Sequence, residues 1–175
     1  MQTAIFGGGC FWCTEAIFRR LNGVSSVVPG YAGGQMENPN YDKVSMGTTG
    51  HAEVIKVEFY PNVISYERLL AVFFALHDAT QVNGQGADIG TQYRSLILTT
   101  SEDQLQEAQS RVMQLKKQGE AVVTQVEPLK KFYDAESYHQ KYYEQNPTTG
   151  YCMVVISPKL DKLREKFPEL LKSSQ

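Results

Sequence analysis

The residue whose surroundings most clearly indicate a reactive side chain is Cys10. It follows the three glycines of Gly7 to Gly9 and precedes Phe11 and Trp12. The residues that follow it, up to Phe18, carry the apolar pattern of a helix, so Cys10 is expected at a helix N-terminus. The first N–H groups of a helix have no intrahelical partners and favour a negative charge beside them. Because the thiolate is the nucleophilic form of cysteine, the pattern predicts a reactive thiol beside an aromatic pocket. The alternative is an inert cysteine buried with its aromatic neighbours in the core.

Glu53 is the second candidate, because it lies on a strand predicted over residues 51–60. It shares one strand face with Ile55 and Val57, whereas Lys56 marks the opposite face as the wetter one. Burial disfavours a charged carboxylate and raises its pKa, which would make Glu53 a proton donor near neutral pH. The alternative is that Glu53, close to the start of the strand, reaches water or an arginine.

The length, charge and composition of the chain exclude several classes of protein. The chain has 175 residues, a formal net charge of −2 and no run of Lys or Arg longer than two, so we expect one catalytic domain over residues 1–175 and no nucleic-acid binding. The longest apolar run, residues 69–76, is too short to span a membrane, and the first residues do not form a signal peptide. We therefore expect a cytoplasmic protein that does not bind membranes. We also expect a monomer.

The cysteine and histidine counts bear on metals and redox chemistry. Three cysteines are too few, and odd in number, for a disulfide scaffold, and they fit a reducing compartment with redox or nucleophilic use. The three histidines and three cysteines show no zinc-ligand spacing, so no metal is expected.

The elements that must position these side chains follow from periodicity and turn residues. Strands are predicted at residues 3–6, 24–29, 51–60, after 91–95 and at 121–127. Helices are predicted from residue 10 to about 20 and at 65–77, 101–118, 135–145 and 158–171. Residues 35–50 and 78–90 are predicted to be irregular loops, and the first of these carries Tyr41. Strands interspersed with helices indicate an α+β two-layer sandwich.

Four separated motifs resemble peptide methionine sulfoxide reductase A. They are Gly9-Cys10-Phe11-Trp12, Gly50-His51-Ala52-Glu53, the run from Asp88 to Ser95, and His139-Gln140-Lys141-Tyr142. Together they cover nearly the whole chain in order, and their combination is far more specific than any one of them. The resemblance implies a plait-like α+β sandwich with an antiparallel-rich mixed sheet, and thiol-dependent reduction of the S epimer of methionine sulfoxide, free and in proteins.

The resemblance also implies roles for individual residues. Cys10 would attack the sulfoxide sulfur and be left as a sulfenic acid, while Glu53 would protonate the sulfoxide oxygen. Tyr41 and Tyr93 would hydrogen-bond that oxygen. Asp88 would organise the site and assist the redox steps.

Recycling needs a second thiol and then a dithiol reductant such as thioredoxin, with no cofactor in the enzyme itself. Cys152 resembles the mobile resolving cysteine of the family. The chain departs from the commoner family pattern at Cys13, where many members have glycine, and a Cys-x-x-Cys pair can itself form a disulfide. We favour Cys152, with Cys13 as the alternative, and expect Phe11 and Trp12 to hold the substrate methyl group.

Two other classes of function are alternatives to methionine sulfoxide reduction. In the first, Cys10 and Cys13 are the working pair of a thiol–disulfide exchange protein or a redox sensor. In the second, Phe11, Trp12 and the tyrosines form a peptide-binding module that needs no thiol. Replacing Cys10 or Cys13 by serine separates these possibilities.

Overall fold

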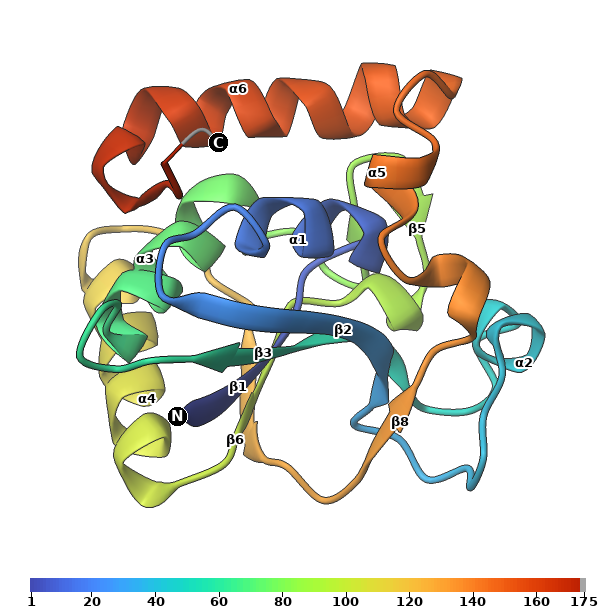
Figure 1. Ribbon diagram of the computed structural model, residues 1–175. Helices are drawn as coiled ribbons and strands as arrows, with labels where there is room; N and C mark the ends of the chain where they lie inside the picture. Colours follow the sequence, from blue (N-terminus) through green and yellow to red (C-terminus); the bar gives the residue numbers. More distant parts are fainter. Residues whose placement is uncertain (174–175) are drawn as a thin grey trace.

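Figure 1 shows the computed structural model of the chain, which describes residues 1–173. Within this range six strands form the main sheet in the order β7-β6-β1-β3-β2-β8, antiparallel except for the parallel pair β6 and β7. Their bounds are β1 (Gln2–Gly7), β2 (Val24–Ala32), β3 (Ala52–Phe59), β6 (Leu96–Thr99), β7 (Gln125–Pro128) and β8 (Phe132–Asp134). This antiparallel-rich mixed sheet with helices confirms the predicted α+β class.

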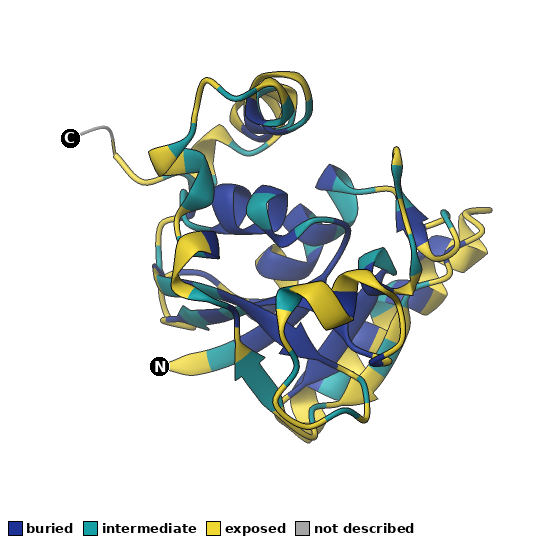
Figure 2. Cartoon of the chain, turned by 90° about the vertical axis from the view of Figure 1, so that its right-hand side faces the viewer, coloured by how far each residue is buried: buried dark blue, intermediate teal, exposed yellow. Residues whose placement is uncertain are grey.

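The longer helices lie on one face of the sheet and at one edge (Figure 1). They are α1 (Phe11–Phe18), α3 (Tyr66–Leu76), α4 (Glu102–Lys117) and α6 (Ser157–Lys166), and the shorter ones are α2 (Tyr41–Ser45) and α5 (Tyr142–Gln145). Helix α1 lies between the sheet and α6, so almost every one of its side chains is buried. Figure 2 shows the buried residues concentrated in the sheet and in the helices directly above it.

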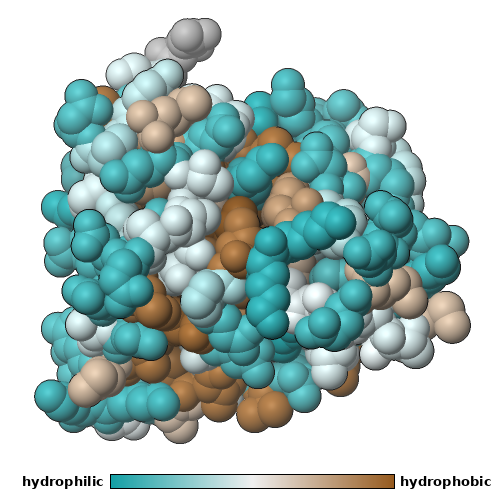
Figure 3. Space-filling view, turned by 90° about the horizontal axis from the view of Figure 1, so that it is seen from below, coloured by the Kyte–Doolittle hydropathy of each residue, from teal (hydrophilic) through white to brown (hydrophobic). Residues whose placement is uncertain are grey.

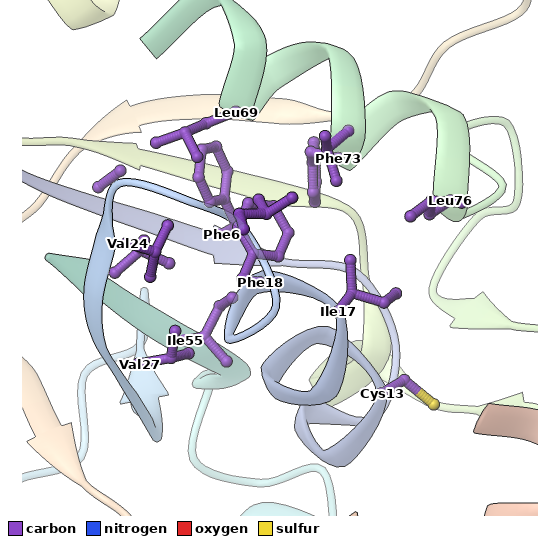
Figure 4. Close-up of a cluster of buried hydrophobic side chains, with 14 of the residues drawn as sticks. Phe6, Cys13, Ile17, Phe18, Val24, Val27, Ile55, Leu69, Phe73 and Leu76 are labelled. Carbon is purple, nitrogen blue, oxygen red and sulfur yellow. The ribbon is translucent and has the colours of Figure 1, made fainter. Parts of the chain in front are cut away.

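The main core fills the space between the sheet, α1 and α3. Phe6 of β1 stacks against Phe18 of α1 and Phe73 of α3, with ring centroids 5.2 and 5.1 Å apart (Figure 4). Ile55 and Val57 of β3 belong to this core. Their neighbours on the other face of the sheet, including Val54, form a second and smaller buried cluster. The view of Figure 3, from below the molecule, shows apolar side chains among polar ones. The predicted alternation of β3 between two faces is confirmed. The face predicted to be wetter is half-buried at Lys56 and Glu58 but fully buried at Val54, because it covers the second cluster.

Most of the long elements begin and end close to the predicted residues. The capping of α4 is as expected, because Ser101 accepts a hydrogen bond from the N–H of Gln104, and Gly119 with φ +93° follows the helix end. The predicted end of β2 at Pro29 was wrong. The strand continues to Ala32, since Gly30 leaves the room that β8 occupies: a Cβ there would lie 2.2 Å from the Phe132 ring.

The second half of the chain departs further from the prediction. Strand β7 begins four residues later than expected, and the helix predicted over residues 135–145 is broken. It splits into a 3-10 turn, η2 (Ser137–His139), and the short α5, because Lys141 between them is left-handed with φ 55°. The helix predicted over 158–171 ends as α6 at Lys166, and Pro168 begins a separate turn, η4 (Pro168–Leu170).

The two predicted irregular loops contain short ordered elements. The first holds α2, whose start is capped by the side chain of Asn40. The second holds a small hairpin of β4 (Gly84–Gln85) and β5 (Asp88–Ile89), followed by the 3-10 turn η1 (Thr91–Tyr93). The two segments meet where the Gln92 side chain donates a hydrogen bond to the Ser45 carbonyl over 3.3 Å. The second segment also contacts the turn after β1, which leads to Cys10.

Candidate active site

Cys10 is positioned by the turn that joins β1 to α1. It is the N-cap residue of α1, as predicted, with extended backbone angles. Gly9 has φ +87° and its N–H donates to the carbonyl oxygen of Tyr93 over 3.2 Å. A Cβ at Gly9 would lie 2.8 Å from the side chain of Gln85. The glycines therefore allow β4 and η1 to close over the turn that presents Cys10.

Glu53 lies at the start of β3 and is held against the same turn. Its side chain is 2% exposed, and its Oε1 accepts a hydrogen bond from the backbone N–H of Phe11 over 3.1 Å. Burial and, to a smaller extent, the charge of Asp88 raise the pKa of Glu53, which is about 8. The N–H of Phe11 and a hydrogen bond with Cys10 oppose this rise in pKa. The predicted buried carboxyl group with a raised pKa is confirmed.

The thiol of Cys10 differs from the expectation of a stabilised thiolate. Burial raises the pKa of Cys10 well above its ordinary value, and the charges of Glu53 and Cys13 add to the rise. A hydrogen bond from the N–H of Trp12, at the start of α1, lowers the pKa of Cys10 as predicted. It is outweighed, so the resting pair consists of a neutral thiol and a carboxyl group that is largely protonated at neutral pH.

Tyr41, Tyr93 and Asp88 come from the two converging loops and face the same pair. Burial raises the pKa values of Tyr41 and Tyr93, and the nearby carboxylate of Glu53 is the next cause in each case. Both phenols therefore remain protonated and able to donate hydrogen bonds at neutral pH. The structure brings these predicted residues together around Cys10 and Glu53.

Comparison with known proteins shows the family to which this chain belongs. The family model described as "Peptide methionine sulfoxide reductase" matches residues 2–171 of this chain. The chain belongs to the peptide methionine sulfoxide reductase family. It is therefore an oxidoreductase of the methionine sulfoxide reductase type.

Relatives and solved structures agree with this assignment. The chain is 54% identical over 162 residues to the "Peptide methionine sulfoxide reductase MsrA" of Nautilia profundicola, with 93% of this chain and 94% of the relative covered. It is similar to reduced Mxr1 from Saccharomyces cerevisiae, with a TM-score of 0.79 and 37% identity over 86% of this chain and 88% of Mxr1. The structure of Mxr1 in complex with Trx2 matches with a TM-score of 0.55 and 28% identity, over 81% and 84% of the two chains.

In this reductase, Tyr151 is a site residue that the sequence pattern did not reveal. Its hydroxyl donates to Oδ2 of Asp88 over 2.9 Å and lies 3.5 Å from Sγ of Cys13. A hydrogen bond with Tyr151 also lowers the pKa of Cys10. Tyr151 therefore links Asp88 to two of the three thiols. Its position next to Cys152 in the sequence was the available signal.

An aromatic wall, defined by Trp12, His139 and Tyr142, borders the reductase site. Nε1 of Trp12 donates to Nδ1 of His139 over 3.0 Å, and the indole ring stacks on Tyr142 at 3.7 Å with an interplanar angle of 5°. Trp12 is half-buried, whereas the ring of Phe11 is fully buried against Tyr31 and His139. Of Phe11 and Trp12, only Trp12 therefore has an exposed ring surface that a substrate can contact in this structure.

Glu136 is a second residue that sequence reasoning missed. Its carboxylate accepts hydrogen bonds from the Tyr31 hydroxyl, the backbone N–H of Tyr41 and the Tyr138 hydroxyl over 3.0, 3.1 and 3.3 Å. Burial raises the pKa of Glu136, but its own backbone N–H, the N–H of Tyr41, the Tyr31 hydroxyl and the charge of His139 together lower it by more. Glu136 thus stays charged and fixes the start of α2, which carries Tyr41.

The reductase contains three free thiols, and two of them are buried. Cys13 lies in the first turn of α1 with its sulfur at the end of the main core (Figure 4). Cys152 begins a π-helical turn (Cys152–Ile156) that leads into α6, and it is 0% exposed. The expected mobile cysteine is therefore buried inside a helical segment in this structure.

Two further features concern metals and membranes. Within residues 1–173 there is no group of three His, Cys, Asp or Glu side chains that could hold a metal ion. In the same range, no helix is both long and apolar enough to cross a bilayer.

Proposed function

We propose that this chain reduces the S epimer of methionine sulfoxide, free and in proteins, with Cys10 as the nucleophile and Glu53 as the proton donor. The observation that carries the proposal is the hydrogen bond between Glu53 and the N–H of Phe11, because it ties the carboxyl group to the residue beside Cys10. A carboxyl group with a pKa of about 8 keeps its proton until a basic oxygen is placed beside it.

The reaction balances without a cofactor. The sulfur of Cys10 attacks the sulfoxide sulfur and forms a transient bond between the two sulfur atoms. The S–O bond of the sulfoxide then breaks as the oxygen bonds to Sγ of Cys10, and the bond between the sulfur atoms breaks as methionine leaves, so that Cys10 becomes a sulfenic acid. Cys10 loses the two electrons that the sulfoxide gains. Glu53 protonates the oxygen, and the proton released by the Cys10 thiol restores the carboxyl group, so no net proton is consumed.

The surrounding residues orient the sulfoxide group. Tyr41 and Tyr93 donate hydrogen bonds to the oxygen, which is supported by their raised pKa values and by their position beside Glu53. Trp12 packs against the methyl group, with Phe11 supporting the site from the core. Asp88 acts through the hydroxyl of Tyr151, which in turn stabilises the Cys10 thiolate.

For recycling, we place Cys152 as the resolving residue and thioredoxin as the reductant. A thiol condenses with the sulfenic acid to give a disulfide and water, and a dithiol then reduces that disulfide. The relative Mxr1, solved in complex with Trx2, supports a thioredoxin partner. Since Cys152 is buried, its segment must move for the bridge to form. Cys13 is the second candidate, favoured by its place three residues after Cys10 and by the Tyr151 hydroxyl that contacts both thiols.

We further propose that the enzyme needs no prosthetic group and works in the cytoplasm. The proposed reaction needs no prosthetic group, since each step uses only thiols, a carboxyl group and an external dithiol. Three free thiols and a dithiol reductant fit a reducing compartment, which supports a cytoplasmic location.

The test is a steady-state assay with thioredoxin, thioredoxin reductase and NADPH, using separated S and R epimers of a methionine sulfoxide peptide. We expect NADPH oxidation with the S epimer only, and none with a Cys10→Ser variant. Equal turnover of both epimers would contradict the assigned specificity. Full activity of Cys10→Ser would remove the proposed nucleophile.

A further inference from the structure

Glu15 is a buried carboxyl group that the proposed reaction does not use. It is 2% exposed and lies in the second turn of α1, one helical turn after Trp12. Its Oε1 accepts a hydrogen bond from the backbone N–H of Lys141, while its Oε2 has no hydrogen-bond partner within residues 1–173. Since a buried carboxyl group with an unsatisfied oxygen destabilises a fold, its presence calls for a compensating role.

The partner of Glu15 lies at the point where the predicted helix breaks. Lys141 is left-handed, with φ 55° and ψ 36°, and is the N-cap residue of α5. This conformation costs a residue with a side chain about 1–2 kcal/mol. The side chain of Lys141 does not cap α5. Glu15 supplies an acceptor from a distant part of the chain and thereby stabilises the left-handed turn.

This turn determines where the aromatic wall stands. His139 lies two residues before Lys141 and accepts the hydrogen bond from Nε1 of Trp12, and Tyr142 lies one residue after it and stacks on the Trp12 ring. A regular helix through Lys141 would rotate these two side chains differently about the axis. The contact of Glu15 with Lys141 therefore adds to the contacts of Phe11, Trp12 and Arg19 that join α1 to residues 139–144.

The position of Trp12 matters because its ring contacts Tyr151, whose hydroxyl reaches the thiols. Trp12 meets the ring of Tyr151 edge-on at 5.8 Å, and the Tyr151 hydroxyl contacts Cys13 and Asp88. A shift of Trp12 would thus change the surface beside Cys10 without altering any of the groups that react.

We propose that Glu15 is a positioning residue for substrate binding, which acts by holding the left-handed turn at Lys141 so that Trp12 stands fixed between His139 and Tyr142. This inference rests on the proposed function in one respect, the contact of Trp12 with the substrate methyl group. Glu15 itself touches no reacting atom.

Glu15 can hold the Lys141 turn whether or not its carboxyl group is charged. Burial raises its pKa to about 7, while the Lys141 N–H and the charges of Arg19 and Lys141 lower it and that of Glu144 raises it. A carbonyl oxygen remains as an acceptor for the Lys141 N–H in both protonation states. Glutamine offers the same acceptor without the charge, so Glu15→Gln should keep the turn.

Trp12 is the only tryptophan in the chain, so its fluorescence reports its own surroundings. In Glu15→Ala we expect a shifted Trp12 emission and a KM for the S-sulfoxide peptide raised by several-fold, up to about tenfold, with a smaller change in kcat. In Glu15→Gln the Trp12 emission and the KM should stay at their wild-type values. Glu144→Gln, which removes a nearby carboxylate that pairs with Arg19 over 3.1 Å at the surface, is the matched control and should change neither.

The double variant Glu15→Ala/Lys141→Gly covers the case in which Glu15→Ala does not fold, because glycine adopts the left-handed turn freely. We expect it to fold and to recover the Trp12 emission and the KM. Wild-type emission and KM in folded Glu15→Ala would overturn the inference. So would a Glu15→Gln variant as defective as Glu15→Ala, or a double variant that shows no recovery. Failure of the proposed function is recognised separately, since the wild-type enzyme would then release no methionine.

Discussion

The carboxyl group of Glu53 accepts a hydrogen bond from the backbone N–H of Phe11, over 3.1 Å, across 42 residues of sequence. This bond joins the start of β3 to the first turn of α1. It holds a buried acid of raised pKa next to the thiol of Cys10, and the proton on that acid sets the pH behaviour of the enzyme.

The rate of sulfoxide reduction should follow the proton on Glu53. With a pKa of about 8, Glu53 is mostly protonated at pH 7, and one pH unit above the pKa about a tenth of it remains so. The single-turnover rate should therefore fall as the pH rises through 8. Glu53→Gln should lower the rate about a hundredfold or more near pH 6.5, with a smaller difference at pH 9, where the wild-type acid is itself ionised.

Glu58→Gln is the matched control, because Glu58 lies on the same strand and faces the wetter side. It should keep the wild-type pH profile. Rates for Glu53→Gln equal to those of the wild type at every pH would exclude Glu53 as the proton donor.

The free energy of unfolding should also decrease as the pH rises, because of Glu53. Its pKa is raised on folding from 4.5 to about 8, so the folded state binds more protons, and its contribution to stability is lost as the pH rises through 8. Between pH 7 and 8.5 we expect the free energy of unfolding of the wild type to fall by about 1 kcal/mol more than that of Glu53→Gln.

Urea unfolding at the two pH values measures this difference. The window excludes His77 and His139, whose lowered pKa values give the opposite slope at more acidic pH. Glu15, with a pKa of about 7, contributes equally to both proteins. Parallel pH profiles for the wild type and Glu53→Gln would show that the pKa of Glu53 is not raised on folding.

The sequence predicted the site better than it predicted the segments around it. The glycines before Cys10 and the alternation along β3 are local patterns, and they placed Cys10 at the N-cap of α1 and Glu53 on the buried face. Tyr151 and Glu136 were missed because their roles depend on contacts with Asp88 and Tyr41, far away in the sequence.

The broken helix at Lys141 has the same origin. Its tyrosine-rich pattern is helical, whereas the acceptor for the N–H of the left-handed Lys141 is the buried carboxyl group of Glu15, 126 residues away. The high pKa of Cys10 was likewise not predictable, because burial and the charge of Glu53 outweigh the helix-start effect that the local sequence suggests.

Tyr151→Phe should make the Cys10 thiolate harder to form. The lost hydroxyl is a hydrogen-bond donor that lowers the pKa of Cys10, so the curve of Cys10 alkylation by iodoacetamide against pH should move to higher pH. Mass mapping of Cys10 separates its alkylation from that of the buried thiols. Tyr143→Phe, whose hydroxyl contacts Ser157 instead, should leave the curve in place. An unchanged curve in Tyr151→Phe would mean that the hydroxyl does not reach the Cys10 sulfur.

Gly9→Ala should both destabilise the protein and slow the reaction. A Cβ at Gly9 combines a left-handed φ of +87° with a 2.8 Å approach to Gln85, which together should cost about 1–3 kcal/mol and displace Cys10. Gly119→Ala is the control, since it shares the left-handed φ but has no atom within 4 Å of the added Cβ. It should lose stability and keep the wild-type single-turnover rate. A Gly9→Ala enzyme with the wild-type rate would contradict the need for a close turn at Cys10.

Cys152→Ser should separate reduction from recycling. Its Cys10 and Glu53 are intact, so it should release one methionine per enzyme, but it should not turn over with thioredoxin. If Cys13→Ser shows this loss and Cys152→Ser does not, the resolving role belongs to Cys13.

The most direct test of the account is a single turnover without external reductant. Fully reduced enzyme is mixed with each epimer of a methionine sulfoxide peptide, and the methionine yield and the cysteine pairing are then determined. We predict methionine from the S epimer only, together with a disulfide between Cys10 and Cys152. A bridge between Cys10 and Cys13 would keep the reaction and reassign the resolving residue. The absence of methionine from both epimers, or oxidised thiols that do not include Cys10, would contradict the role of Cys10 as the nucleophile that reduces methionine sulfoxide.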